Sequence, residues 1–212
     1  MPDPARLAFF VGAALALLAV PGPAVIYIVT QSIGQGRRAG VVSCAGIFTG
    51  TLVHVGAATI GLSALLASSA TAFDVVKYAG AAYLIYVGLR RLAGREPEPA
   101  PDRPKVRSHA HLYRQGVVVN VLNPKTALFF LAFLPQFVDP SRGSATLQIL
   151  FLGLLFAVLG FCNDSTYALV AGTFGDWLRT SRRYLRGQRY VSGAVFVGLG
   201  AVAALSAPVR KN

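Results

Sequence analysis

The sequence predicts an all-α integral membrane protein of six transmembrane helices, with a broken first and fourth helix and a 3+3 inverted repeat. Three observations support this fold class. Of the 212 residues, 54% are hydrophobic and only 13% are charged, whereas a soluble domain carries about 25% charged residues. The apolar residues form six runs, most of them near the ~20 residues that a helix needs to cross a bilayer. Two of these runs contain proline near their middle.

The six runs predict spans at about 7–33, 41–66, 73–89, 116–138, 147–171 and 190–207. The chain 1–212 is then one transmembrane domain, with a first half of about 1–92 and a second half of about 113–212. A Pro-rich cytoplasmic loop of about 93–112 joins them. Arg6 is the only basic residue before the first run, and prolines occupy the region where signal-peptide cleavage is expected. We therefore expect an uncleaved first helix.

Basic residues predict the orientation of the chain in the membrane. Most of the 20 lysines and arginines lie in the connections 34–40, 90–115 and 172–189, on one side of the predicted bilayer. The positive-inside rule places that side in the cytoplasm, so both termini are expected outside. The net charge of +12 is thereby explained by loop charge and not by nucleic-acid binding.

The two proline interruptions carry the functional prediction. Pro21-Gly22-Pro23 interrupts the first span and Asn123-Pro124-Lys125 interrupts the fourth. Proline removes a backbone donor, and broken helices are tolerated in lipid only where protein or a watery cavity surrounds them. Paired broken helices in two inverted halves are typical of transporters with a site at the membrane midplane. The alternative is that the prolines only kink the helices for packing.

Lys125, Asp164 and His54 are ionisable residues inside predicted spans, where charge is costly. Lys125 either binds a substrate carboxylate or satisfies carbonyls freed by the proline break. Asp164 either binds a substrate ammonium or carries a coupling proton, or else forms an ion pair with Lys125 or an arginine. His54 either relays protons or packs as a hydrogen-bonded side chain. Asn120 and Asn123 are three residues apart and are expected to share one helix face near the site.

Other patterns are absent or structural. The chain contains no H-E-x-x-H, G-x-S-x-G or P-loop sequence, which argues against an enzyme. Cys44 and Cys162 lie in apolar runs, and the three histidines are too few for a metal centre, so we expect no metal or other cofactor. Gly46 and Gly50 form a G-x-x-x-G pattern, which indicates close helix packing inside the protein and also allows a homodimer.

The chain resembles the LysE/RhtB family of bacterial amino-acid exporters over nearly its whole length. The matching residues are Pro21-Gly22-Pro23, Gly34, Gly36-Arg37-Arg38-Ala39-Gly40, Gly46, Gly50, Gly61-Leu62, the segment Lys77 to Leu84, Gly88, Gly116, Asn120, the segment Asn123 to Phe130, and Pro135-Gln136-Phe137-Val138.

This resemblance implies efflux of amino acids or close analogues across the bacterial inner membrane, driven by the proton motive force. The partners are then an amino acid, the lipid bilayer and protons. Family members often place a carboxylate near position 51, where this chain has Thr51, which favours a neutral substrate. A divalent-cation exporter and a non-transporting membrane assembly subunit stay open as alternatives.

Overall fold

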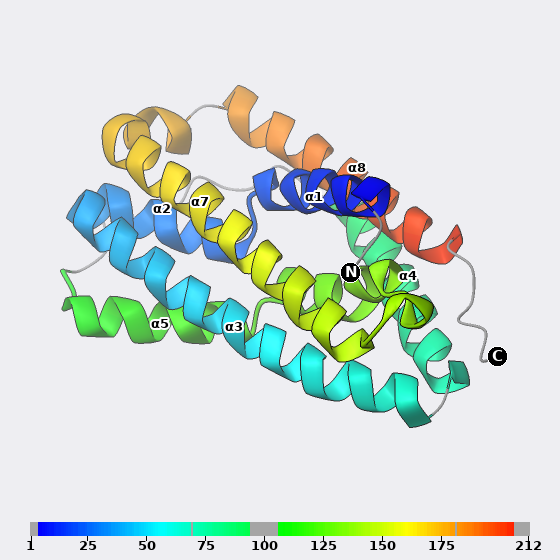
Figure 1. Cartoon of the computed structure of the whole chain (residues 1–212). Coiled ribbons are helices and arrows are strands. Elements are labelled where there is room, and N and C mark those ends of the chain that lie inside the picture. The colour runs from blue at the N-terminus through cyan, green and yellow to red at the C-terminus, as the bar shows by residue number, and fades with distance from the viewer. Residues whose placement is uncertain (1–3, 69, 94–105, 181, 206–212) are drawn as a thin grey trace.

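The fold is known from a computed structural model, which describes residues 4–68, 70–93, 106–180 and 182–205. Throughout these residues the regular elements are helices (Figure 1). They are α1 (Pro4–Ala19), α2 (Pro23–Gln35), α3 (Arg37–Ser68), α4 (Ala70–Ala93), α5 (His109–Val121), α6 (Pro124–Leu128), the π-helix η1 (Phe129–Phe133), the 3₁₀-helices η2 (Leu134–Phe137) and η3 (Pro140–Arg142), α7 (Ala145–Thr180) and α8 (Arg182–Leu205). The all-helical prediction is confirmed for this part of the chain.

Two helices are long and apolar enough to cross a membrane, namely Arg37–Leu62 within α3 and Ala145–Thr173 within α7. Two bent pairs add one candidate span each: α1 and α2 meet at 52°, and α5 meets the helices that follow it at 44°. The described residues therefore supply two to four candidate spans, and both predicted helix breaks are confirmed. Six spans would also require α4 and α8 to cross, and that number stays a prediction.

The helices extend further than the apolar runs from which we predicted them. The segment 172–189 was expected to be a connection, but α7 continues to Thr180 and α8 begins at Arg182. α5 begins at His109, seven residues before the predicted start at Gly116, with the Ser108 side chain accepting from the His111 amide at 3.3 Å. Arginine and glutamine are good helix formers, so a helix continues past the end of its apolar stretch. The Pro-rich segment 94–105 lies outside the described residues.

The long helices α3 and α7 run side by side in opposite directions, and α5 packs along α3 (Figure 1). The start of α1, the end of α3 and the start of α7 lie toward one end of the molecule, which we call the Arg6 end. The end of α2, the start of α3 and the start of α5 lie toward the other, which we call the Arg37 end. α4 packs mainly on α8.

Glycines permit the closest of these contacts. A Cβ atom at Gly46 would lie 2.2 Å from the Tyr113 carbonyl oxygen, and one at Gly50 would lie 2.8 Å from the Asn120 Cβ. Both glycines of the G-x-x-x-G pattern therefore pack α3 against α5 within one chain. This surface of α3 is therefore buried within one chain and is not free to form a homodimer interface.

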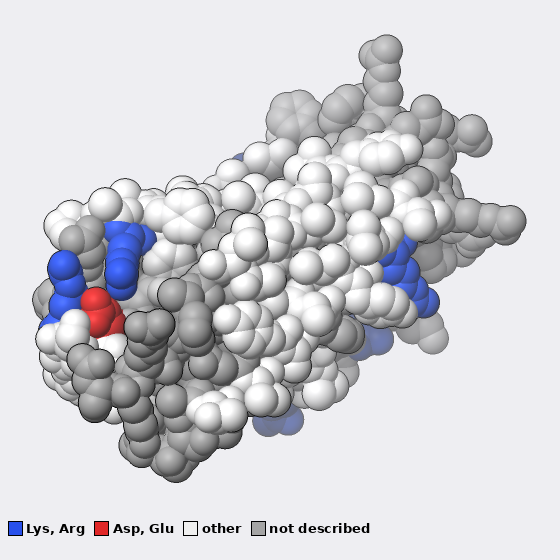
Figure 2. Space-filling model, turned by 90° about the vertical axis from the view of Figure 1, so that its right-hand side faces the viewer, with Lys and Arg blue, Asp and Glu red and all other residues white. Residues whose placement is uncertain are grey.

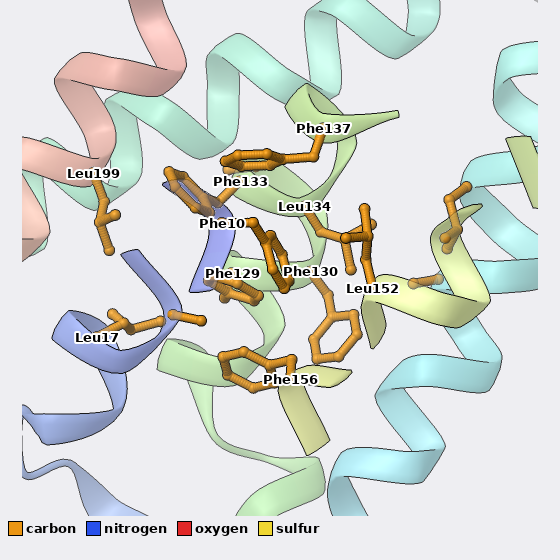
Figure 3. Packing of buried hydrophobic residues seen from close by; sticks show 14 of the residues in the cluster. Phe10, Leu17, Phe129, Phe130, Phe133, Leu134, Phe137, Leu152, Phe156 and Leu199 are labelled. Carbon is orange, nitrogen blue, oxygen red and sulfur yellow. The ribbon is translucent and has the colours of Figure 1, made fainter. Parts of the chain in front are cut away.

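The Arg6 end contains the larger apolar core (Figure 3). The rings of Phe129 and Phe156 stack with centroids 4.1 Å apart, and Phe10 meets Phe137 edge-on at 5.1 Å. Offset and edge-on ring pairs of this kind add stabilisation beyond that of the buried area. The cluster joins α1, η1, η2 and α7.

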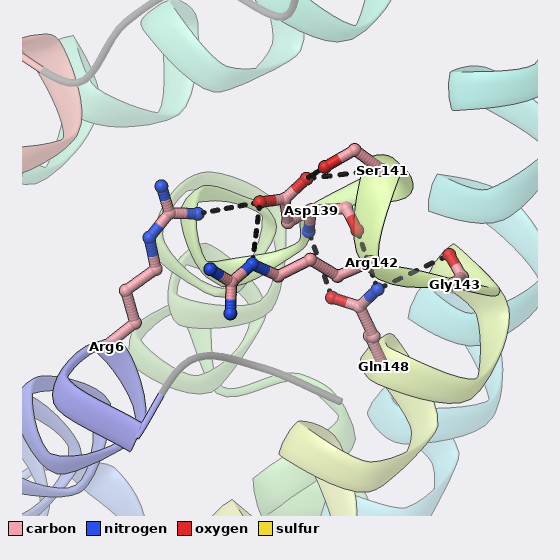
Figure 4. Close-up of polar contacts among 6 residues, drawn as sticks. All are labelled: Arg6, Asp139, Ser141, Arg142, Gly143 and Gln148. Carbon is pink, nitrogen blue, oxygen red and sulfur yellow. Dashed lines mark hydrogen bonds and ion pairs between the residues drawn. The ribbon is translucent and has the colours of Figure 1, made fainter.

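Outside the core, Asp139 organises the connection between η2 and α7 (Figure 4). Its carboxylate accepts from Ser141 Oγ at 2.6 Å and pairs with Arg6 at 3.4 Å and Arg142 at 3.6 Å. The Ser141 hydrogen bond, with help from the two guanidinium groups, holds the pKa of Asp139 below its usual value. The start of α1 is thereby tied to the connection that leads into α7.

Charge is sparse on the part of the surface that the structure describes. On the face shown in Figure 2, lysines and arginines lie in separate small groups with broad uncharged surface between them. Large apolar side chains such as Ile60, Leu122 and Leu147 are exposed on the helices. An uncharged apolar surface of this kind is what a lipid-facing protein requires, because lipid offers ions no solvation.

The packing of α3 on α5 makes a direct prediction about stability. Gly46→Ala would drive a methyl group into the Tyr113 carbonyl, and we expect it to lower the free energy of unfolding by about 1–3 kcal/mol. Gly56→Ala is the matched control on the same helix, because a Cβ atom there meets nothing within 4 Å. Thermal unfolding in detergent measures both. Equal melting temperatures for the two variants would contradict the packing described.

Candidate functional site

The first helix break leaves carbonyl groups at the end of α1 without helical partners. Side chains from two other helices satisfy three consecutive carbonyls. Asn163 Nδ2 donates to Leu18 O at 3.1 Å, Tyr167 OH donates to Ala19 O at 2.8 Å, and Lys125 Nζ donates to Val20 O. The ammonium of Lys125 thus sits at the negative end of the α1 dipole. This contact is the one expected if Lys125 satisfies a carbonyl freed by the break, and carboxylate binding by Lys125 stays a prediction.

The two breaks differ in how the following helix begins. Proline occupies the first helical position in both, where its missing amide donor is harmless. At α6, the Asn123 side chain caps the helix by accepting from Lys125 N at 3.1 Å. At α2, the N-cap residue is Gly22, which has no side chain to offer. Since Ile26 N makes the first helical bond, to Gly22 O, the amides of Ala24 and Val25 precede the hydrogen-bonded part of α2.

Asn120 connects α5, α3 and α6. Its Nδ2 donates to Ile47 O and to Thr51 Oγ1, both at 2.8 Å. Its Oδ1 accepts from Thr126 Oγ1 at 3.1 Å and from Asn123 Nδ2 at 3.3 Å. A buried amide with both polar atoms satisfied holds its neighbours in one arrangement. Asn120 therefore fixes the second break against α3.

Between the two breaks lies a small cavity of about 30 Å³. Its polar lining includes Thr51, Asn120, Lys125 and Asp164. Lys125 is 9% exposed and Asp164 is 7% exposed, so one basic and one acidic side chain are buried around the same space. The remaining lining is formed by Leu18, Gly22, Ala24, Val25, Ile47, Asn123, Thr126, Phe156 and Gly160. Such a volume has room for on the order of two water molecules.

The structure brings most of the predicted site residues together. Gly22, Asn120, Asn123, Lys125 and Asp164 all line the cavity. The three prolines serve the backbone: Pro21 is buried in the break, while Pro23 and Pro124 begin α2 and α6 and are exposed. The prediction that Asn120 and Asn123 share a helix face was wrong, because α5 ends at Val121. Their side chains meet because Asn123 folds back as the cap of α6.

His54 lies apart from this cavity. Its Nε2 is 2.9 Å from Asn120 O, and its ring stacks on Phe130 with centroids 6.0 Å apart. It lines a separate, largely apolar cavity of about 370 Å³ beside Ala127 and Phe130. The hydrogen-bonded packing role predicted as one alternative for His54 is confirmed.

The capping roles of Asn163 and Tyr167 and the place of Thr126 in the Asn120 network were not predicted from the sequence. A signal for the first pair exists, because positions 163 and 167 are one turn apart on a helix and face the same way. No comparable pattern marks Thr126, whose partner is six positions away across a helix break. Among the described residues, no group of three or more His, Cys, Asp or Glu side chains could hold a metal ion.

Residues 15–207 match the family model described as LysE type translocator. The homoserine/homoserine lactone efflux protein of Salmonella typhimurium is 31% identical over 184 residues, 87% of this chain and 88% of that protein. The protein of that name from Salmonella typhi is 30% identical over 184 residues, again 87% and 88%.

An uncharacterized membrane protein of Vibrio cholerae is 31% identical over 194 residues, 92% of this chain and 93% of that protein. No solved structure matches the chain. The match across the helix breaks, the cavity and most of both halves shows that the chain belongs to the LysE type translocator family and is a membrane transporter, not an enzyme.

Proposed function

We propose that the protein exports neutral amino acids of the homoserine type, and their lactones, from the cytoplasm across the bacterial inner membrane. The observation that carries this proposal is the pairing of buried Lys125 and buried Asp164 around one cavity between two helix breaks. A zwitterionic amino acid offers one carboxylate and one ammonium group, which match these two side chains in charge. The names of the Salmonella relatives support the substrate class.

The carboxylate would bind at the start of α2. Gly22, Ala24 and Val25 line the cavity, and no side chain caps this helix start. Uncapped amides at a helix N-terminus bind anions, because the helix dipole adds to their hydrogen bonds. Lys125 lies beside them, since a Cβ atom on Gly22 would be 3.1 Å from Lys125 Cδ. Residue 22 must stay small for the lysine to reach both the α1 carbonyl and a bound carboxylate.

The ammonium group would bind Asp164, which lies on α7 and lines the same cavity. Thr51 and Asn120 complete a polar wall that suits a hydroxyl or carbonyl group of the substrate. A second carboxylate for a basic side chain is not among the lining residues. This composition supports a neutral substrate.

Transport requires this cavity to enlarge, because a volume of about 30 Å³ is too small for an amino acid. We infer alternating access in a 3+3 inverted repeat that exchanges α3 with α7 and α4 with α8. The packing of α3 on α7 and of α4 on α8 supports this pairing, since each contact maps onto itself under such an exchange. Six spans with both termini in the periplasm complete the proposed topology.

The proton motive force would drive export. Asp164 is the residue we propose to carry the coupling proton, because it is the acidic group that lines the cavity. His54 would take part in proton transfer only through Asn120, whose carbonyl oxygen it contacts. The two alternatives have less support: the cavity lining offers a single carboxylate to a hard divalent cation, and the G-x-x-x-G surface that favoured an assembly subunit is buried between α3 and α5.

The first test is export of radiolabelled homoserine from loaded cells. We expect wild-type protein to export it and a protonophore to abolish export. Asp164→Asn should weaken apparent affinity or rate by about 10–100-fold, the effect of losing a hydrogen bond to a charged group. Asp139→Asn is the matched control, because Asp139 lies in the connection at the Arg6 end and should leave export unchanged. Wild-type export by Asp164→Asn would refute the site.

The second test separates the two substrates. Homoserine lactone has no carboxylate, so Lys125→Gln should impair export of homoserine at least tenfold more than export of the lactone. A lysine that only holds Val20 O would affect both substrates equally, because the damage would be to the fold of the break. The measurement is the ratio of the two efflux rates in the same cells.

The third test concerns topology. An enzyme reporter that is active only in the periplasm should be active when fused to the N-terminus and inactive when fused after Pro101. If a reporter that works only in the cytoplasm is active when fused to the N-terminus, the orientation is overturned.

A further inference from the structure

The cavity lies between two apolar clusters of unequal size. The larger is the phenylalanine-rich core toward the Arg6 end, which reaches the cavity at Leu18 and Phe156. The smaller, which we call the inner cluster, reaches the cavity at Ala24 and Ile47. The inner cluster consists of Ala24, Tyr27, Ile28, Cys44, Ile47 and Ala168, with Val119 packed against it.

Each helix places the inner cluster on the Arg37 side of the cavity. On α2, Tyr27 and Ile28 follow the cavity residues Ala24 and Val25 by about one turn. On α3, Cys44 precedes Ile47, and on α7, Ala168 follows Asp164. The layer from Ala24 to Ile28 is only about 6 Å thick at 1.5 Å per residue, whereas the core on the other side spans Phe10 to Leu18 on α1, about 12 Å.

Polar side chains resume directly beyond this thin layer. Gln31 and Ser32 are buried on the next turn of α2, at 6% and 1% exposure. Gln35 Nε2 donates to Gln31 Oε1 at 3.1 Å, and Gln35 Oε1 accepts from Arg107 N at 2.7 Å. A single apolar layer therefore separates the polar cavity from a polar region that leads to the Arg37 end.

One hydrogen bond holds α2 against α5 across this layer. Tyr27 OH donates to Leu112 O at 2.7 Å, and the phenol is 8% exposed. Beyond it, Ser32 Oγ is buried without a hydrogen-bond partner in the described part of the chain. A buried unpaired hydroxyl favours any movement of α2 that lets water or another group reach it. α2 is thus held to α5 at Tyr27, whereas about one turn further on the Ser32 hydroxyl has no hydrogen-bond partner among the described residues.

We propose that the inner cluster is the cytoplasmic gate of the transporter and that Tyr27 is the positioning residue that keeps it closed. Opening breaks the bond to Leu112, moves α2 away from α5 and α7, and lets water and substrate pass the layer to the cavity. The gate rests on the proposed function in two respects: that export passes through this cavity, and that the Arg37 end faces the cytoplasm.

Cys44 provides a reporter that the protein already contains. It lies inside the inner cluster and is 0% exposed, so a water-soluble thiol reagent reaches it only when the gate opens. The sequence has two cysteines, and the exposed one, Cys162, is removed by Cys162→Ser. The experiment measures the rate at which a membrane-impermeant methanethiosulfonate modifies Cys44, in inside-out and right-side-out vesicles, without substrate.

We expect slow modification from the cytoplasmic side and none from the periplasmic side. Tyr27→Phe should accelerate modification about fivefold, the factor that corresponds to one buried hydrogen bond of ordinary strength. Tyr113→Phe is the matched control, because it also removes a phenol contact between helices, the 2.8 Å contact to Thr49 Oγ1, but lies outside the inner cluster. Ile28→Ala, which thins the layer, should accelerate modification as well.

Equal rates for Tyr27→Phe and Tyr113→Phe would overturn the gate, as would modification from the periplasmic side. Melting temperatures of the variants, measured in parallel, show whether a faster rate comes from general unfolding, which would also count against the gate. Because no substrate is present, the result is independent of homoserine export. A gated Cys44 together with no homoserine export would reject the substrate and keep the gate.

Discussion

Backbone hydrogen bonding at the two helix breaks is the constraint on which the rest of the structure depends. In lipid, a carbonyl without a partner costs several kcal/mol. The end of α1 leaves three such groups, and Asn163, Tyr167 and Lys125 reach them from α7 and α6. These bonds fix where the second break and α7 must lie relative to the first. The cavity is the space that remains between groups brought together for this purpose.

The same constraint explains why structural and binding roles coincide at Lys125. An ammonium that satisfies a carbonyl at the negative end of one helix also lies beside the uncapped positive end of the next. Gly22 makes this possible, since a larger residue would displace the lysine. A substrate carboxylate would therefore meet a charge that the fold already stabilises, so the protein need not bury an isolated lysine for binding.

Asymmetry between the two ends of the cavity follows from side-chain size. Toward the Arg6 end, the rings of Phe10, Phe129 and Phe156 interlock, and opening would have to separate several aromatic contacts. Toward the Arg37 end, small residues such as Ala24, Cys44 and Ala168 form a thin layer with fewer apolar atoms to expose. The thin layer exposes fewer apolar atoms when it opens, which is why we place the gate toward the Arg37 end.

The sequence by itself determined the helical class, the positions of both breaks and the burial of Lys125 and Asp164. Composition and proline act locally, and a charged side chain exposed to lipid is costly, so each of these features can be predicted from the residues themselves. Only the tertiary structure decided that Asn123 caps α6, that His54 faces a separate cavity, and that Gly46 and Gly50 pack against α5. Each of these depends on a partner 66 or more residues away or on the exact end of a helix. Pairings across such distances leave no periodic trace in a single chain, so no pattern along it could have indicated them.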